Sequence, residues 1–143
     1  MTTSIDNACQ EIVNVLNTIT GIAGTVPINP NETQNSDLFA LAFPEEGVIS
    51  AEPIGSRLAL HDIAIYLMKR RIDQATDLSV IKPFIDTVPA ALLAEVSTGG
   101  TRFNNTISTF GNITYKYEFL IYAGVEFTCY HFIMHRAKIL VNN

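Results

Sequence analysis

The chain has 143 residues, of which 48% are apolar and 16% are charged, and its 14 acidic residues outnumber its 9 basic ones. This length suits one domain with its own core, so we predict a single domain over residues 1–143. The charged fraction is below the roughly 25% of an average soluble domain, which favours a surface that partners cover in part. The net charge of −5 argues against electrostatic binding of a nucleic acid, because neutralising phosphates requires clustered lysine and arginine.

Cysteine content and the N-terminal sequence bear on the compartment. Cys9 and Cys129 are too few for a disulfide framework and lack the spacing of a zinc or redox motif, so we expect two buried reduced thiols in an intracellular protein. Residues 1–6 show neither the basic nor the apolar segment of a secretory signal. Asparagines and prolines interrupt the uncharged run at 12–31, so no transmembrane helix is expected.

The first third of the chain predicts one helix and one strand. Apolar residues at three- and four-residue steps predict an amphipathic helix over 4–20, which Gly21 should end by adopting a positive φ. Prolines and asparagines then predict a loop over 24–37. A short apolar strand over 38–43 should end at the following proline, and a second loop or extended piece should occupy 45–53.

The middle of the chain predicts a strand and a helix. Residues 57–70 read as a strand that is apolar on both faces and therefore covered on both. Apolar residues repeating at 3,4,3,4 predict a helix over about 74–95, which Pro83 and Pro89 should kink or split. A flexible loop should follow at 98–101.

The last part of the chain predicts a long antiparallel hairpin. Strands over about 110–122 and 125–139 should be joined by the tight turn at 123–124. The resulting order, α-β-β-α-β-β, predicts an α+β fold with two helices on an antiparallel-rich sheet. Most of the hairpin aromatics should lie in the core, and subunit contacts should cover the apolar excess on its two faces. These aromatics are Tyr115, Tyr117, Phe119, Tyr122, Phe127, Tyr130 and Phe132.

The three histidines offer the first catalytic or metal-binding hypothesis. His131 and His135 are four residues apart on one predicted strand, hence on the same face, and His61 lies on another strand. At about 3.3 Å per residue the first two are too far apart to share one zinc ion without a bulge. Asp62 follows His61 directly, but neighbours in a strand point to opposite faces, so this carboxylate should not orient that imidazole. We therefore expect no metal site and no cofactor.

Other polar groups are weaker candidates. Ser56 and Ser108 could serve as nucleophiles, but the chain has no G-x-S-x-G motif. The glycines at 21 and 24 form neither a P-loop nor a dinucleotide-binding sequence. Glu45 and Glu46 should form an exposed acidic pair that is either solvated or part of a partner surface.

The order and wording of these segments resemble a known family. An N-terminal amphipathic helix, a Pro/Asn loop, and the segments LFALAFP, RLALHDIAIYLMKRR, VIKPFIDTVPAALLAEV, TGGT and YAGVEFTCYHFIMHRAKI together resemble the tail terminator, or tail completion, proteins of tailed bacteriophages. The resemblance spans nearly the whole chain. It implies a small α+β subunit without catalytic residues that joins others in a hexameric ring on the head-proximal end of the tail tube, stops tube polymerisation and presents the surface to which the head joins.

The resemblance also implies partners and a location. They are other copies of the chain, the tail tube protein, a head-completion or connector protein, and the sheath protein if the tail is contractile, in the neck region of a virion assembled in the host cytoplasm. Genome DNA would pass through the ring lumen without specific binding, which an acidic lumen would favour. The residues we expect at partner interfaces are Glu45, Glu46, Arg102, Phe103, Tyr122 and Phe132.

Three other functions stay open from the sequence. A head-completion or connector protein of the same kind of virion would differ in its neighbours more than in its physical character. An enzyme on an α+β scaffold is the second alternative. A tail tube subunit is disfavoured, because such chains form a sandwich with more strands.

Overall fold

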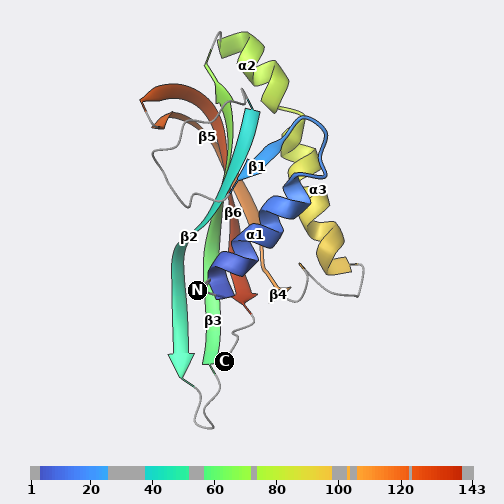
Figure 1. Cartoon of the computed structure of the whole chain (residues 1–143), viewed down its shortest axis with the longest axis vertical. Helices are drawn as coiled ribbons and strands as arrows, with labels where there is room; N and C mark the ends of the chain where they lie inside the picture. The colour runs from blue at the N-terminus through green and yellow to red at the C-terminus, as the bar shows by residue number, and fades with distance from the viewer. Residues whose placement is uncertain are drawn as a thin grey trace.

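The computed structural model describes residues 4–25, 38–51, 57–71, 74–97, 103, 106–122 and 124–139 (Figure 1). The expected loop at 98–101, most of that at 24–37 and the last part of that at 45–53 lie outside these residues. The α+β class is confirmed. The elements in chain order are α1 (Ser4–Leu16), β1 (Ala23–Thr25), β2 (Leu38–Ala51), β3 (Arg57–Arg70), α2 (Gln74–Ile81), α3 (Phe84–Ser97), β4 (Ile107–Thr109), β5 (Ile113–Tyr122) and β6 (Val125–Ile139).

The strands form one curled sheet in the order β1-β2-β3-β6. Both β4 and β5 pair with the far side of β6, β4 near its end and β5 along its first ten residues. All pairs are antiparallel except β1 with β2. The loop expected from residue 24 is therefore wrong for residues 24 and 25, which belong to β1, a three-residue strand too short to show a period in the sequence.

Strand β2 is much longer than expected. Its pairing with β3 runs to Ala51, and the ladder is offset at a bulge between Pro44 and Glu46. The expectation that the strand ends at Pro44 was wrong. Of the two alternatives predicted for residues 45–53, the extended piece is confirmed over residues 45–51 and the loop is wrong there. Proline lacks an N–H donor, but an edge strand tolerates it where that donor would face no neighbour, and β1 pairs with β2 only as far as Leu41.

The first helix is shorter than its apolar period. α1 ends at Leu16, whereas the sequence predicted a helix as far as residue 20. The backbone tightens there, because the N–H groups of Thr18 and Ile19 donate to carbonyls three residues back, and the Thr18 hydroxyl donates to the Val15 carbonyl at 2.6 Å. Gly21 adopts the predicted positive φ, at 95°, in the turn that follows the helix.

The second predicted helix is split in two, as its prolines suggested. α2 ends at Ile81 and α3 starts at Phe84, with Pro83 between them. Pro89 remains inside α3. The Lys82 N–H still donates to the Leu78 carbonyl at 2.9 Å, so the break begins at the proline, which has no donor of its own.

The C-terminal hairpin is confirmed, with β5 and β6 joined through Gly124 at φ 79°. Strand β4 was not predicted. It continues the line of β5 along β6 after an interruption at residues 110–112. The His135 N–H and C=O bond to the backbones of Asn112 and Gly111, both at 2.8 Å, so the ladder is bridged across this gap.

The main core lies between the helices and one face of the sheet, which we call the helix face. Figure 1 shows α1 and α3 together on this side. Alternation along the strands places Ala40, Ala42, Ile63, Ile65, Leu67, Tyr130, Phe132 and Met134 on it, where they meet Ala8, Cys9, Ile12, Val13, Leu16, Ile81, Val88 and Leu92 of the helices. This interface confirms the amphipathic stripe predicted for the first helix.

A smaller core lies on the opposite face. Phe39 and Leu41 of β2, Met68 of β3, and Phe127 and Cys129 of β6 are buried there. The sheet curls so that Phe39 and Phe127 meet edge to face with ring centroids 5.4 Å apart. Figure 1 shows the β5–β6 hairpin bending away from the helices. The prediction that the 57–70 strand is covered on both faces is thus confirmed.

Candidate functional site

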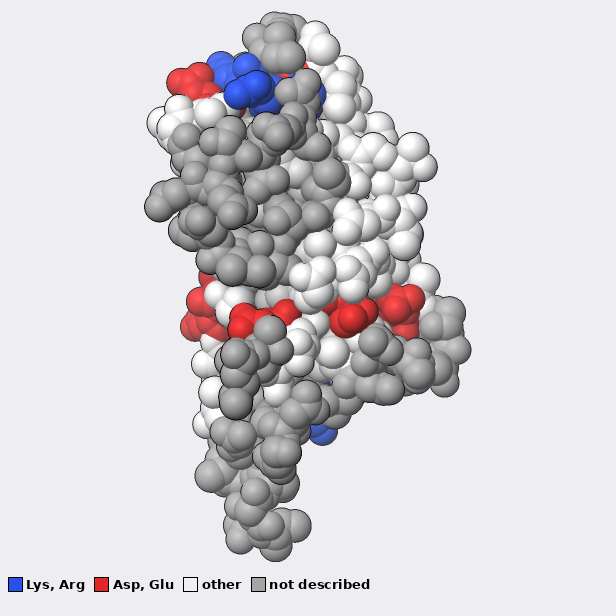
Figure 2. Space-filling model, in the orientation of Figure 1, with Lys and Arg blue, Asp and Glu red and all other residues white. Residues whose placement is uncertain are grey.

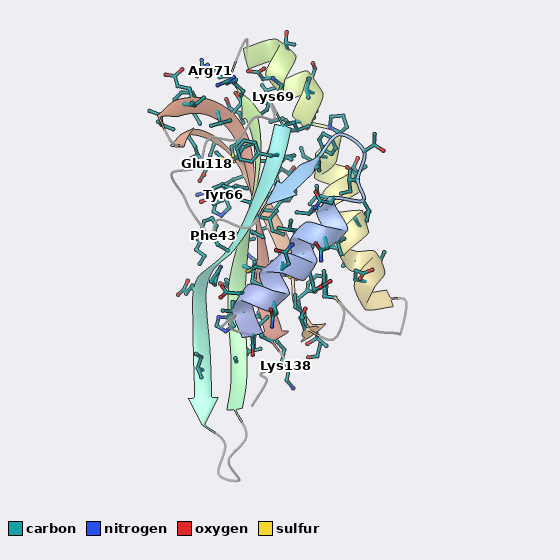
Figure 3. All side chains as sticks on the ribbon, in the orientation of Figure 1. Phe43, Tyr66, Lys69, Arg71, Glu118 and Lys138 are labelled. Atoms are coloured by element: carbon teal, nitrogen blue, oxygen red, sulfur yellow. The ribbon has the colours of Figure 1, made fainter. Side chains whose placement is uncertain are left out.

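Three aromatic rings form a stack on the opposite face of the sheet. Tyr66 of β3 lies between Phe43 of β2 and His131 of β6, with centroid separations of 5.5 Å and 4.2 Å and near-parallel planes. Figure 3 shows Phe43 and Tyr66 side by side. The alternation of β3 puts Tyr66 on this face, and the register pairs it directly with His131. The imidazole is only 4% exposed.

Two carboxylates flank this buried imidazole. Glu45 Oε2 lies 3.0 Å from Nε2 of His131, and Glu118 Oε1 lies 3.5 Å from its Nδ1. Nδ1 is buried without a well-aligned hydrogen bond, so its contact with Glu118 is electrostatic. Lys116 Nζ lies 2.9 Å from Glu118 Oε1. These side chains form a row of interacting polar groups that also includes Tyr66, which stacks on His131. The bulge in β2 inserts Glu45 at the position from which it reaches β6.

The electrostatics of this row favour ionised Glu118. Partial burial of Glu118 raises the pKa of its carboxyl, but the hydrogen bond from Lys116 and the adjacent His131 outweigh that effect and hold the pKa below its usual value. On Tyr66, burial and the nearby Glu118 and Glu45 carboxylates raise the pKa to about 12. The row therefore contains a neutral phenol beside two carboxylates at neutral pH.

Acid should destabilise the protein in part through Glu118. Because its pKa is lower in the folded state, the folded state gains stability from the ionised group above the unfolded pKa, near 4.5, and loses that stability as the pH falls through the folded value. We expect Glu118→Gln to weaken the acid dependence of the free energy of unfolding below that pH, by up to about 1 kcal/mol. Urea unfolding at pH 7 and pH 3.5 measures it. An unchanged difference between the two pH values would contradict this assignment.

A second polar cluster lies on β3 and β6, beside a bulge in β6. Asp62 Oδ1 accepts the backbone N–H of Arg136 at 3.0 Å, and that N–H is presented by a left-handed backbone with φ 56°. His135 Nε2 lies 2.8 Å from the Thr114 hydroxyl, while its Nδ1 lies 3.7 Å from Asp62 Oδ2. The order hydroxyl, imidazole, carboxylate is that of a hydrolase triad. The last distance is too long for a hydrogen bond, so the triad is not assembled.

The three histidines lie on different faces of the sheet, which decides the hypotheses about them. His131 and His135 share the face opposite the helices, as predicted, and each has its own carboxylate partner. His61 points to the helix face, where its ring lies so close to Gly47 that a Cβ at that glycine would clash with it. Asp62 and His61 thus point to opposite faces of the sheet, as predicted, and the carboxylate does not orient that imidazole. Within the described ranges, no group of three or more His, Cys, Asp or Glu side chains could hold a metal ion.

The remaining candidates are two serines and two cysteines. Ser108 lies on β4, its hydroxyl 3.5 Å from the Lys138 carbonyl, while Ser56 lies outside the described residues. Both cysteines are free and buried, as predicted, and burial raises the pKa of each thiol, to about 12 for Cys9.

The residues expected at partner interfaces are exposed in some cases and buried in others. Glu45 and Glu46 are exposed, as predicted. Phe103 and Phe132 are 1% and 0% exposed in the main core, so the expectation that they meet a partner is corrected: their rings stabilise the subunit itself. Arg102 and the side chain of Tyr122 lie outside what the structure describes.

Exposed apolar side chains gather on two strands. Of the eight large apolar side chains that are exposed among the described residues, six belong to β2 or β5: Val48, Ile49, Tyr115, Tyr117, Phe119 and Ile121. The prediction that most hairpin aromatics are buried holds for β6 and fails for β5. Among the described residues, the main helix contacts are with β1, β2, β3 and β6, and the helix face of β5 stays exposed from Tyr115 to Ile121.

Charged side chains are unevenly distributed over the face that Figure 2 shows. Figure 2 shows a band of acidic side chains across the middle of one face and basic side chains near one end. Figure 3 places Lys69 and Arg71 at that end. The Arg71 guanidinium lies 4.6 Å from the centre of the Phe119 ring, a cation–π contact.

The chain was compared with known proteins. No protein-family model matches it, and no curated protein matches it. No helix within the described residues is long and apolar enough to cross a membrane.

Proposed function

We propose that this protein is a structural subunit of a sixfold ring that caps the head-proximal end of a bacteriophage tail tube. The observation that carries the proposal is the concentration of exposed apolar side chains on β2 and β5, because exposed apolar patches mark surfaces that bind other proteins. The resemblance in segment order to tail terminator proteins supports the identity of the ring.

The ring would stop growth of the tube by covering its last interface. A bound cap buries the apolar and hydrogen-bonding surface that the next tube ring would use, so polymerisation ends there. The exposed Glu45 and Glu46 belong to the surface proposed to meet partners, where charges act mainly on association rate and partner choice. The acidic band in Figure 2 is compatible with a lumen along which DNA slides without binding.

Deleting the gene from a phage that carries it tests this function. We expect tails of abnormal, often excessive, length that do not join heads, while heads and tube subunits are otherwise normal. Electron microscopy of lysates measures tail length and head attachment, and expression of the intact chain from a plasmid is the matched control.

Two results would overturn the proposal. Tails of normal length that fail to join heads would reject the terminator role and favour the head-completion or connector protein. Hydrolytic or transfer activity of the purified protein would favour the enzyme alternative.

A further inference from the structure

We infer that copies of this chain associate head to tail by edge pairing, the outer edge of β2 in one copy adding to the outer edge of β5 in the next. The closing of such contacts into a ring rests on the function proposed above. The edge contact itself rests on the exposed strands and is tested separately.

The outer edge of β2 is open over most of its length. Within the described residues its only outer neighbour is β1, which pairs with residues 39–41. Pro44 and the bulge blunt the first part of this edge, but past the bulge the residues 46–51 have a partner among the described strands on the β3 side alone. Past the bulge, Val48 and Ile49 are 63% and 65% exposed, one on each face of the sheet.

The outer edge of β5 is open in the same way. β5 is ten residues long and pairs with β6 on one side, and no described strand lies on its other side. Its helix face carries the exposed stripe Tyr115, Tyr117, Phe119 and Ile121. A strand edge beside an exposed apolar stripe is a template for another strand, and β5 contains no proline that would blunt that edge.

The strand directions fit a continuous sheet between copies. β2 is antiparallel to β3, β3 to β6 and β6 to β5, so β5 runs antiparallel to β2. A second copy in the same orientation would therefore place its β2 antiparallel to the first copy's β5. Ile49 lies on the helix face, as the β5 stripe does, so the two apolar surfaces would meet on one face of the joined sheet.

Charge favours this pairing over a two-fold one. Pairing β2 with β2 would bring the exposed Glu45 and Glu46 of two copies together and would leave the β5 stripe in water. Head-to-tail pairing instead places those carboxylates beside β5, whose two charged residues, Lys116 and Glu118, offset each other. It also uses both open edges of every copy, as a heterologous interface that can close into a ring does.

Cysteine cross-linking tests the contact. Side chains directly opposite on paired strands have Cβ atoms about 4.5–5.5 Å apart, close to disulfide geometry. Ile49→Cys protein is mixed in turn with Tyr115→Cys, Tyr117→Cys, Phe119→Cys and Ile121→Cys proteins at high concentration under mild oxidation. The native cysteines are buried and do not interfere.

We expect a mixed disulfide dimer between Ile49→Cys and one or two of the β5 variants, whose positions read out the register. Leu93→Cys, at another exposed apolar site, on α3 (51% exposed), is the matched control and should give no excess of dimer with Ile49→Cys. Ile49→Cys dimerising mainly with itself would overturn head-to-tail pairing in favour of a two-fold contact. Yields no higher than with Leu93→Cys would overturn edge pairing altogether.

A second variant pair separates this inference from the proposed function. Ile49→Arg places a charge at the edge and should abolish assembly and capping while leaving the melting temperature of the subunit unchanged, and Leu93→Arg should leave both intact. If Ile49→Arg still assembles and caps, the edge contact is wrong and the capping function stands. If cross-linking succeeds but deletion of the gene leaves tails normal, the function fails and the edge contact stands.

Discussion

Replacing Leu16 by aspartate should unfold the subunit. Leu16 is the last residue of α1 and is 0% exposed in the main core. The substitution removes a buried isobutyl group and puts a carboxyl among apolar side chains, which costs at least about 4 kcal/mol. That loss approaches the total stability of a small domain, roughly 5–15 kcal/mol. Circular dichroism and thermal melting should show loss of the cooperative transition, and the protein should be insoluble.

Leu93→Asp is the matched control for this experiment. Leu93 is also a helical leucine, but it is 51% exposed, so its substitution should change the stability by less than about 0.5 kcal/mol. Ile85→Asp should fall between the two, because Ile85 is only partly buried against the core. A Leu16→Asp protein as soluble and stable as the parent would mean that the register of α1 is wrong.

The spacing of apolar residues predicted the elements that are long enough to show a helical or strand period. These elements are the apolar face of α1, the strand β3 that is buried on both faces, and the long hairpin. The short strands β1 and β4 did not, because three residues show no period and their pairing depends on distant partners. The extension of β2 was missed because Pro44 suggests an end, and only the edge position explains why it is tolerated.

The polar clusters depend on register, which a single sequence does not reveal. Glu45 and His131 are 86 positions apart, and the bulge that brings them together has no sequence signal beyond a proline followed by two glutamates. The exposure of the β5 aromatics depends on where the helices stop on the sheet. The sequence did contain an excess of apolar side chains in the hairpin, which pointed to subunit contacts without identifying the strand.

One buried ion pair was not predicted. Lys69 Nζ, on β3, lies 3.3 Å from Asp77 Oδ1, on α2, and the two side chains are 10% and 0% exposed. The sequence showed only a basic run, Lys69-Arg70-Arg71, of which the first residue turns inward. The ammonium also donates to the Arg70 carbonyl at 3.0 Å. This pair connects α2 to the end of β3, next to the strands that form the smaller core.

Asp77→Ala should destabilise the subunit by about 3–5 kcal/mol, because it leaves the Lys69 ammonium buried without its counter-charge. Chemical denaturation measures the free energy of unfolding. Lys116→Ala is the matched control: it breaks the exposed Lys116–Glu118 pair, whose lysine is 62% exposed, and should change the stability far less, because solvent screens such a pair. Replacing both buried partners, as Lys69→Met with Asp77→Leu, should cost less than Asp77→Ala alone, since no charge is then left unpaired. Equal losses for Asp77→Ala and Lys116→Ala would show that solvent reaches Lys69 and that the pair does not hold α2 on the sheet.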